Sequence, residues 1–146
     1  MTEFFKRQFE YNFQINQVFI DSFRKKMPPS EALRLLSHVV NAHFIWLQRM
    51  GLETEAPDVW EIHLPETLDV FNRELHQLTN QLLDQEGWQD RVINYKNTRG
   101  EAYMNTAKDI LFHLVNHSTH HRAQISFLLR RMEIEPPKTD FIFWAR

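Results

Sequence analysis

Three histidines lie four residues apart in a stretch whose pattern predicts an α-helix. They are His113, His117 and His121, within residues 111–125. Residues at positions i and i+4 of a helix have Cβ atoms about 6 Å apart, so His117 and His121 can direct ring nitrogens at one ion. Apolar residues near this face indicate that the imidazoles point inward, where each needs a partner. The spacing is typical of metal-ligating histidines.

A metal-free explanation stays open for these histidines. An imidazole on a partly apolar helical face is often satisfied by a backbone carbonyl or an acidic neighbour. A third inward-facing histidine on another helix would favour a metal. His38 meets this condition, because Leu35, His38 and Ala42 recur at helical spacing on one apolar stripe. The two segments together favour a metal centre between two helices.

The remaining histidines before residue 110 are expected to lie outside the site. His43 follows His38 by five residues, so the turn of about 100° per residue rotates it away from the centre. We interpret His43 as a flanking residue that at most supports a ligand. His63 lies in a predicted loop and His76 lies off the apolar stripe of its helix, so both are predicted to face solvent.

Length and composition favour one helical domain. The chain has 146 residues, which suits a single domain over residues 1–146 with one core. Its three glycines and six prolines disfavour a turn-rich β fold. The absence of cysteine excludes disulfides, thiolate nucleophiles and cysteine-ligated metals. A bound metal must therefore use histidine, carboxylate or water.

Charge and hydropathy limit the partners and the location. The formal net charge is −2 and no cationic stripe follows the chain, so nucleic acid is not an expected partner. No apolar run reaches the roughly 18 residues of a membrane span, and the N-terminus lacks the apolar region of a secretory signal. We expect a cytoplasmic protein without a membrane partner.

Hydrophobic periodicity and helix-end signals predict four helices and hence an all-α, four-helix-bundle fold. The predicted helices cover residues 3–26, 31–50, 65–87 and 106–132, and residues 52–63 form a loop over one end of the domain. Residues 88–105 alternate in polarity, which predicts a short hairpin or an extended crossover between helices three and four. A long crossover would let helix four lie parallel to helix three.

The sequence does not assign a single role to Asn16 or to the C-terminal tail. Asn16 is either a surface residue of the first helix or an interior amide that braces a ligand. The tail after Pro136 and Pro137 cannot continue the last helix, so its aromatic residues must dock elsewhere on the domain.

Three segments carry a resemblance to a known family. They read Leu-Ser-His-Val-Val-Asn-Ala at 36–42, Asn-His-Ser-Thr-His-His-Arg-Ala-Gln-Ile at 116–125 and Pro-Pro-Lys-Thr-Asp-Phe at 136–141. Over nearly the whole chain the sequence resembles the DinB/YfiT-like superfamily of small bacterial metalloproteins. The resemblance implies a four-helix bundle, often homodimeric, with one divalent metal ion held by His38, His117 and His121.

The chain departs from the family pattern at two positions. Ala123 stands where the family commonly has glycine, and His120 stands where it commonly has an aromatic or small residue. Neither position is a ligand. His120 projects to a different flank from His121 and is interpreted as an interface or surface residue.

Three neutral imidazoles without a carboxylate would leave a divalent ion with an open position, as in catalytic sites. Such an ion can lower the pKa of bound water towards ~7 or bind a thiolate, which permits hydrolysis or thiol transfer. The superfamily resembles hydrolases in some cases and low-molecular-weight thiol transferases in others. Zinc or nickel is expected first, and iron, cobalt and copper also suit the ligands. Asp140 in the tail is the main rival for the fourth position.

Two expectations about partners follow. The 12 phenylalanines and 4 tryptophans exceed what one small core must hide, which favours a homodimer, as the family resemblance also does. A low-molecular-weight thiol or another small molecule is the expected substrate if the protein is an enzyme. In the alternative function, the metal fastens helices two and four of a non-catalytic, stress-associated binding or oligomeric module.

Overall fold

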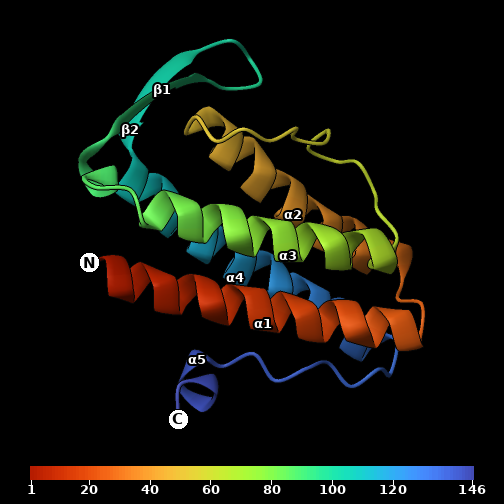
Figure 1. Ribbon diagram of the computed structural model, residues 1–146. Helices are drawn as coiled ribbons and strands as arrows, with labels where there is room; N and C mark the ends of the chain where they lie inside the picture. The colour runs from red at the N-terminus through yellow and green to blue at the C-terminus, as the bar shows by residue number, and fades with distance from the viewer.

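The computed structural model describes residues 1–146 and is mostly helical, as predicted, with a small two-stranded sheet (Figure 1). The long helices are α1 (Thr2–Lys25), α2 (Ser30–Arg49), α3 (Pro65–Leu83) and α4 (Ala107–Arg131). The shorter elements are the 3-10 helix η1 (Trp88–Asp90), the antiparallel strands β1 (Val92–Lys96) and β2 (Ala102–Thr106), and α5 (Phe141–Trp144). No helix combines the length and the apolar character needed to cross a membrane.

Local signals explain where several helices begin and end. Pro65 occupies the start of α3, where its missing N–H costs no hydrogen bond. Thr106 caps α4 by accepting a hydrogen bond from the backbone N–H of Asp109 at 3.2 Å. Gly51 follows α2 with φ of 87°, a conformation that favours glycine. The α2 helix begins at Ser30, and Pro29 occupies its cap position.

The long helices pack most closely in the pairs α1–α3 and α2–α4, and contacts of α2 with α3 and of α1 with α4 join these pairs. Figure 1 shows that the connection running the length of the molecule is the one between α2 and α3. The β1–β2 hairpin stays at one end, and α4 returns antiparallel to α3. Of the two predicted connections, the hairpin is the one observed, so the parallel placement that an extended crossover would have allowed does not occur.

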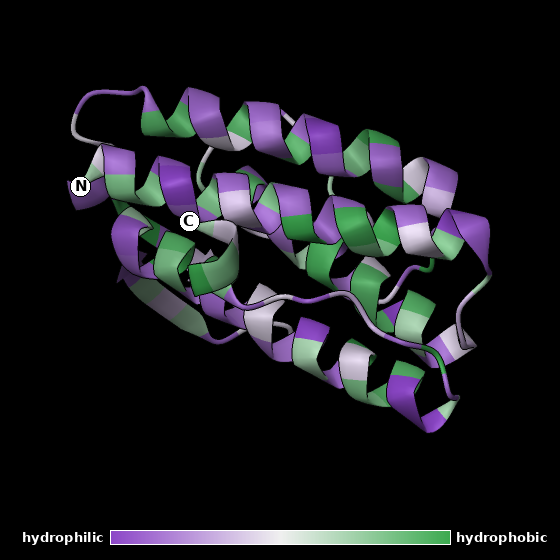
Figure 2. Cartoon of the chain, turned by 90° about the horizontal axis from the view of Figure 1, so that it is seen from below, coloured by the Kyte–Doolittle hydropathy of each residue, from purple (hydrophilic) through white to green (hydrophobic).

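A single apolar cluster of 27 buried residues draws on α1, α2, α3 and α4, and it includes Trp88 of η1 and Ile93 of β1. Hydrophobic and hydrophilic residues alternate along each helix in Figure 2, as expected for amphipathic helices that share one core. Burial of these apolar side chains is the main favourable contribution to folding.

A buried cation fixes the rotation of α4 against α1. The Arg122 side chain is 1% exposed, donates to Asn16 Oδ1 at 3.1 Å and to Thr119 Oγ1 at 3.3 Å, and lies 5.1 Å over the Tyr11 ring. Burial lowers the pKa of Arg122. Asn16 is therefore an interior residue, and it braces this guanidinium and not a histidine ligand.

The C-terminal tail docks on the domain, as its aromatic residues predict, and the structure shows that the docking surface is α1. The Tyr11 ring packs edge-on against Phe141 and Trp144, at 5.2 and 5.6 Å between centroids. The Tyr11 hydroxyl donates to the carbonyl of Thr139, and the Trp144 indole N–H donates to Gln14 Oε1 at 2.8 Å. These contacts hold α5 against the first helix.

His43 is a core residue and not a flank of the candidate site. Its ring lies 5.4 Å from the Phe9 ring, and its Nε2–H donates to Thr79 Oγ1 at 3.0 Å, while the Thr79 hydroxyl donates to the Leu75 carbonyl. Burial lowers the pKa of His43 from 6.5 to about 3. The imidazole is therefore neutral in the folded protein near pH 7.

The buried neutral His43 makes stability depend on pH. As the pH falls from 6.5 towards about 3, the unfolded chain protonates this histidine while the folded chain does not, so the native state loses stability. His43→Gln keeps an N–H donor without a titratable ring. As the pH falls, the free energy of unfolding of the metal-free wild-type protein should decrease more steeply than that of His43→Gln. The two slopes should differ by up to about 1.4 kcal/mol per pH unit. Urea unfolding at several pH values measures the free energy of unfolding of both proteins. Equal pH dependence in the wild type and the variant would contradict the prediction.

Candidate metal centre

Helices α2 and α4 bring three histidines together. His38 comes from α2, and His117 and His121 lie one turn apart on α4. One ligand atom of each lies within 4.8 Å of those of the other two, a group that can hold a metal ion. The ring centroids are 4.9 Å apart for His38 with either partner and 4.5 Å apart for His117 with His121. These are the three residues that the sequence predicts as ligands.

The separation of two ring nitrogens suits a shared ion. His38 Nε2 and His117 Nε2 lie 3.1 Å apart. Two nitrogens bound to a tetrahedral zinc ion at its usual bond length lie roughly 3.3 Å apart. A proton shared between the two nitrogens is also compatible with this distance. The donor set therefore fits a divalent ion without requiring one.

Hydrogen bonds on the far side of two rings orient the ligand nitrogens. His38 Nδ1–H donates to the Val59 carbonyl at 3.0 Å, and His121 Nδ1–H donates to Gln124 Oε1 at 2.7 Å. Protonated Nδ1 atoms leave the Nε2 lone pairs free for a metal, the usual arrangement around ligating histidines. His117 Nδ1 is buried without a partner.

Burial keeps the three rings neutral. It lowers the pKa of His38 and His121 below 6.5, and it lowers the pKa of His117 to about 3 with help from the neighbouring histidines. A neutral imidazole retains the lone pair that a metal requires. The electrostatic environment near pH 7 is therefore suited to ligation.

The loop between α2 and α3 lies over His38 and runs the length of the molecule, whereas the sequence predicts that residues 52–63 cover one end of the domain. The Trp60 ring stacks on the His38 ring at 3.9 Å with 11° between planes, and the Arg34 guanidinium lies 4.3 Å from the Trp60 ring. Asn41 Nδ2 fixes the loop by donating to the carbonyls of Asp58 at 3.0 Å and Glu61 at 2.8 Å. This anchoring holds the Val59 carbonyl in place.

The same loop explains why His63 is not solvent-facing. His63 is 7% exposed, its Nε2 lies 2.8 Å from Asn41 Oδ1, and its backbone N–H donates to Ser37 Oγ at 3.1 Å. His76 is half-buried, with its ring stacked on Phe13 at 4.4 Å. The prediction of solvent exposure is wrong for His63 because the α2–α3 loop and α2 enclose its ring, and it holds only in part for His76, whose side chain is 24% exposed. Neither histidine belongs to the three-histidine group.

His113 and His120 border the group without joining it. The exposed His113 ring lies 5.5 Å from the His117 ring, one turn before it on α4. His120 is exposed, as its interpretation as a surface residue predicts, and its ring lies 5.0 Å from that of His121.

Residues that the sequence did not single out support the ligands. The His121–Gln124 spacing of three residues on one helix is a detectable signal for Gln124. No comparable signal identifies Val59 or Trp60, which reach His38 only through the path of the loop.

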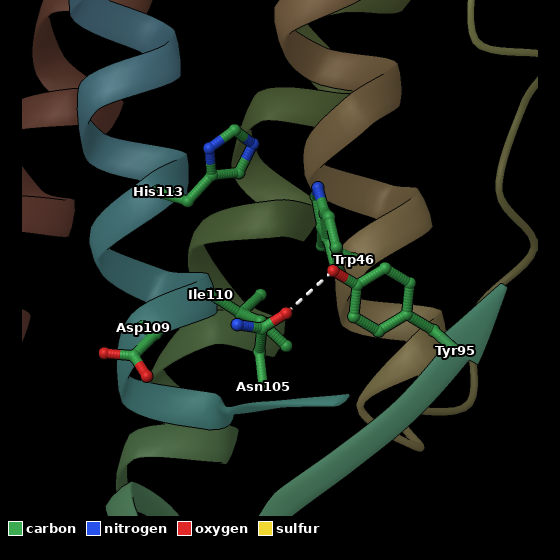
Figure 3. Close-up of a pocket in the computed structure, with 6 residues that line it drawn as sticks. All are labelled: Trp46, Tyr95, Asn105, Asp109, Ile110 and His113. Carbon is green, nitrogen blue, oxygen red and sulfur yellow. Dashed lines mark hydrogen bonds between the residues drawn. The ribbon is translucent and has the colours of Figure 1, made fainter. Parts of the chain in front are cut away.

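Two cavities border α4 near the three-histidine group. The larger, of about 670 Å³, is lined by Glu31, Arg34, Leu35, Trp60, His120, His121, Ala123, Gln124, Phe127 and Leu128. The smaller, of about 280 Å³, is lined by His113 and five other residues (Figure 3). His121 is thus both a member of the three-histidine group and part of a cavity wall.

Asp140 lies outside the group. It is exposed, and its backbone carbonyl accepts from the N–H groups of Phe143 at 3.1 Å and Trp144 at 3.3 Å at the start of α5. The three-histidine group contains no carboxylate. The tail acid therefore starts a helical turn and supplies no ligand in this structure.

Comparison with known families gives one decisive result. The model of the DinB family matches residues 15–146, which include α2, α4 and all three histidines. The chain belongs to the DinB family. A search of curated proteins found no match. Membership of the DinB family confirms the resemblance seen in the sequence.

Removing His117 should abolish stable metal binding. We expect His117→Ala to lose most of its bound divalent metal, because the two remaining imidazoles hold an ion far more weakly. His113→Ala is the matched control, since His113 is one turn away on the same helix and outside the group. Elemental analysis and competition with a chelator measure the effect. Equal metal content in His117→Ala and wild type would refute the assignment.

Gln124 should strengthen metal binding without being a ligand. We expect Gln124→Leu to weaken metal binding about 10–100-fold, because it removes the acceptor that orients His121. Gln77→Leu on α3 is the control, since Gln77 is exposed and makes no side-chain hydrogen bond. Metal titration of both variants tests this, and unchanged affinity in Gln124→Leu would show that the contact is incidental.

Proposed function

We propose that this DinB-family protein is a metal-dependent enzyme, a thiol-dependent transferase or a hydrolase. His38, His117 and His121 hold one divalent ion, with zinc or nickel expected first and iron, cobalt or copper as alternatives. The observation that supports an enzyme is the position of His121, which belongs to the three-histidine group and lines a cavity of about 670 Å³. A substrate in that cavity would be next to the metal.

The donor set supports catalysis more than a purely structural site. Structural zinc sites are usually closed by four protein ligands, and here only three ligands converge. When bound, the ion supplies a Lewis acid of net charge +2 that stabilises a developing anion on sulfur or oxygen. The surrounding protein groups prepare the ligands for it, because Val59 and Gln124 keep two imidazoles oriented and burial keeps all three neutral.

The lining of the larger cavity suits a small molecule with apolar and anionic parts. The exposed rings of Trp60 and Phe127 offer apolar contact. Arg34 is paired with Glu31 through hydrogen bonds of 2.8 and 2.7 Å, and its remaining guanidinium nitrogen can donate to an anionic group. A low-molecular-weight thiol that carries carboxylates matches these groups, which is why thiol transfer is placed before hydrolysis.

A non-catalytic function is the alternative. The stacking of Trp60 on His38 and the bond from His38 to the Val59 carbonyl connect the loop, α2 and α4 at one point. A metal there would fasten these elements in a stress-associated binding or oligomeric module. The proposed four-helix bundle would then serve as a scaffold.

We also propose a homodimer formed through the long helices. Phe112 and Phe127 of α4 are 57% and 60% exposed, which is unusual for aromatic rings on one helix of a monomer. Light scattering at micromolar concentration tests this, and a monomeric mass would exclude it.

An open metal position separates the enzyme from the module. In the cobalt-substituted protein, visible absorption should change on addition of a small thiol or azide, because an exogenous ligand enters the coordination sphere. Asp140→Asn should keep its metal content, since Asp140 is outside the group. An unresponsive spectrum together with metal loss in Asp140→Asn would instead show a closed structural ion.

A further inference from the structure

The smaller cavity is a separate feature that the proposed reaction does not use. It has a volume of about 280 Å³ and lies between α2, α4 and the β1–β2 hairpin (Figure 3). Its lining residues are Trp46, Tyr95, Asn105, Asp109, Ile110 and His113. None of them belongs to the three-histidine group. A few polar groups on an apolar concave surface are typical of a small-molecule site.

Several polar groups of this cavity have unused hydrogen-bonding capacity. The Tyr95 hydroxyl donates to Asn105 Oδ1 at 2.8 Å, which leaves the Asn105 amide nitrogen free. The indole N–H of Trp46 and both ring nitrogens of His113 make no hydrogen bond within the protein, and both side chains line the cavity together with Asn105. The free groups are mainly donors, so a matching ligand must carry acceptor atoms.

The one acid of the cavity does not compete for these donors. Asp109 Oδ2 accepts from the Thr106 hydroxyl at 2.7 Å. Figure 3 shows the Asp109 carboxylate turned away from Trp46, Tyr95 and His113, which surround one space. An anionic ligand in that space would therefore not meet the carboxylate directly.

Ring geometry and charge define the ligand further. Trp46 and Tyr95 meet edge to face at 4.8 Å between centroids. The Arg49 guanidinium lies 4.6 Å from the Trp46 ring and 5.2 Å from the Tyr95 ring, so a positive charge adjoins both. Aromatic walls favour a flat ring, and the nearby cation favours a negative charge.

We propose that this cavity binds a small aromatic carboxylate. Its ring packs against Trp46 and Tyr95, and its carboxylate accepts hydrogen bonds from the Trp46 indole N–H and from His113. The cavity is large enough for a single substituted ring. This inference goes beyond the proposed function and does not depend on it, because none of the residues that carry it is a proposed metal ligand.

Titration of the full-length protein with benzoate tests the proposal. The indole ¹H–¹⁵N resonance of Trp46, assigned by its loss in Trp46→Phe, should shift saturably in both the zinc-loaded and the chelator-treated protein. Trp46→Phe keeps an aromatic ring and removes one donor to a charged oxygen, so the affinity, followed by ligand-detected NMR, should fall about tenfold. Trp60→Phe, the same change in the larger cavity, should leave it unchanged.

Related probes test shape and charge. Benzyl alcohol, which keeps the ring but not the charge, and cyclohexanecarboxylate, which keeps the charge but not the flat ring, should each bind several-fold more weakly than benzoate. Benzylamine should not bind.

Four results would overturn the proposal: no saturable shift, equal binding of benzylamine, a loss of affinity in Trp60→Phe instead of Trp46→Phe, or loss of binding on metal removal. The last would show that benzoate is a metal ligand. Metal content is measured separately, so failure of the metal assignment remains distinguishable from failure of this inference.

Discussion

The candidate site depends on keeping three imidazoles neutral and close together in a partly buried place. Such rings are costly to charge, which is why burial lowers the pKa of His117 to about 3. They are also costly to leave without partners. The Val59 carbonyl and the Gln124 amide satisfy two of them, and the nitrogens that remain face one another at 3.1 Å between His38 and His117. These nitrogens form a group that can hold a divalent cation.

Arg122, the neighbour of the proposed ligand His121, fixes the direction in which the His121 side chain points. His121 and Arg122 are adjacent on α4, so their side chains point about 100° apart. Arg122 is held on the side of α1 by Asn16 and by the Tyr11 ring. Rotation of α4 that moved His121 away from His38 would expose or unpair this buried guanidinium, which is costly. The same Tyr11 ring anchors the tail, so tail docking and site geometry are connected through α1.

The α2–α3 loop contributes in a different way. It supplies a backbone carbonyl and a stacked indole to His38, and it is itself held by Asn41. A backbone acceptor has no side-chain identity, so its position depends on the whole path of the loop. The site is therefore assembled from two helices that provide the three histidines and one loop that fixes the orientation of a ring.

The sequence by itself determined the helices, the inward face of His38 and the i, i+4 pair His117 and His121, because helical periodicity is a local property. It also predicted the hairpin-forming alternation before α4. The tertiary structure decided which helices pair and where the chain crosses over, since the long connection joins α2 to a parallel α3, whereas the hairpin returns α4 antiparallel to α3. It also decided the burial of His43 and His63 and the roles of Asn16, Val59 and Trp60. Those outcomes depend on contacts between residues far apart in the chain, which no local pattern encodes.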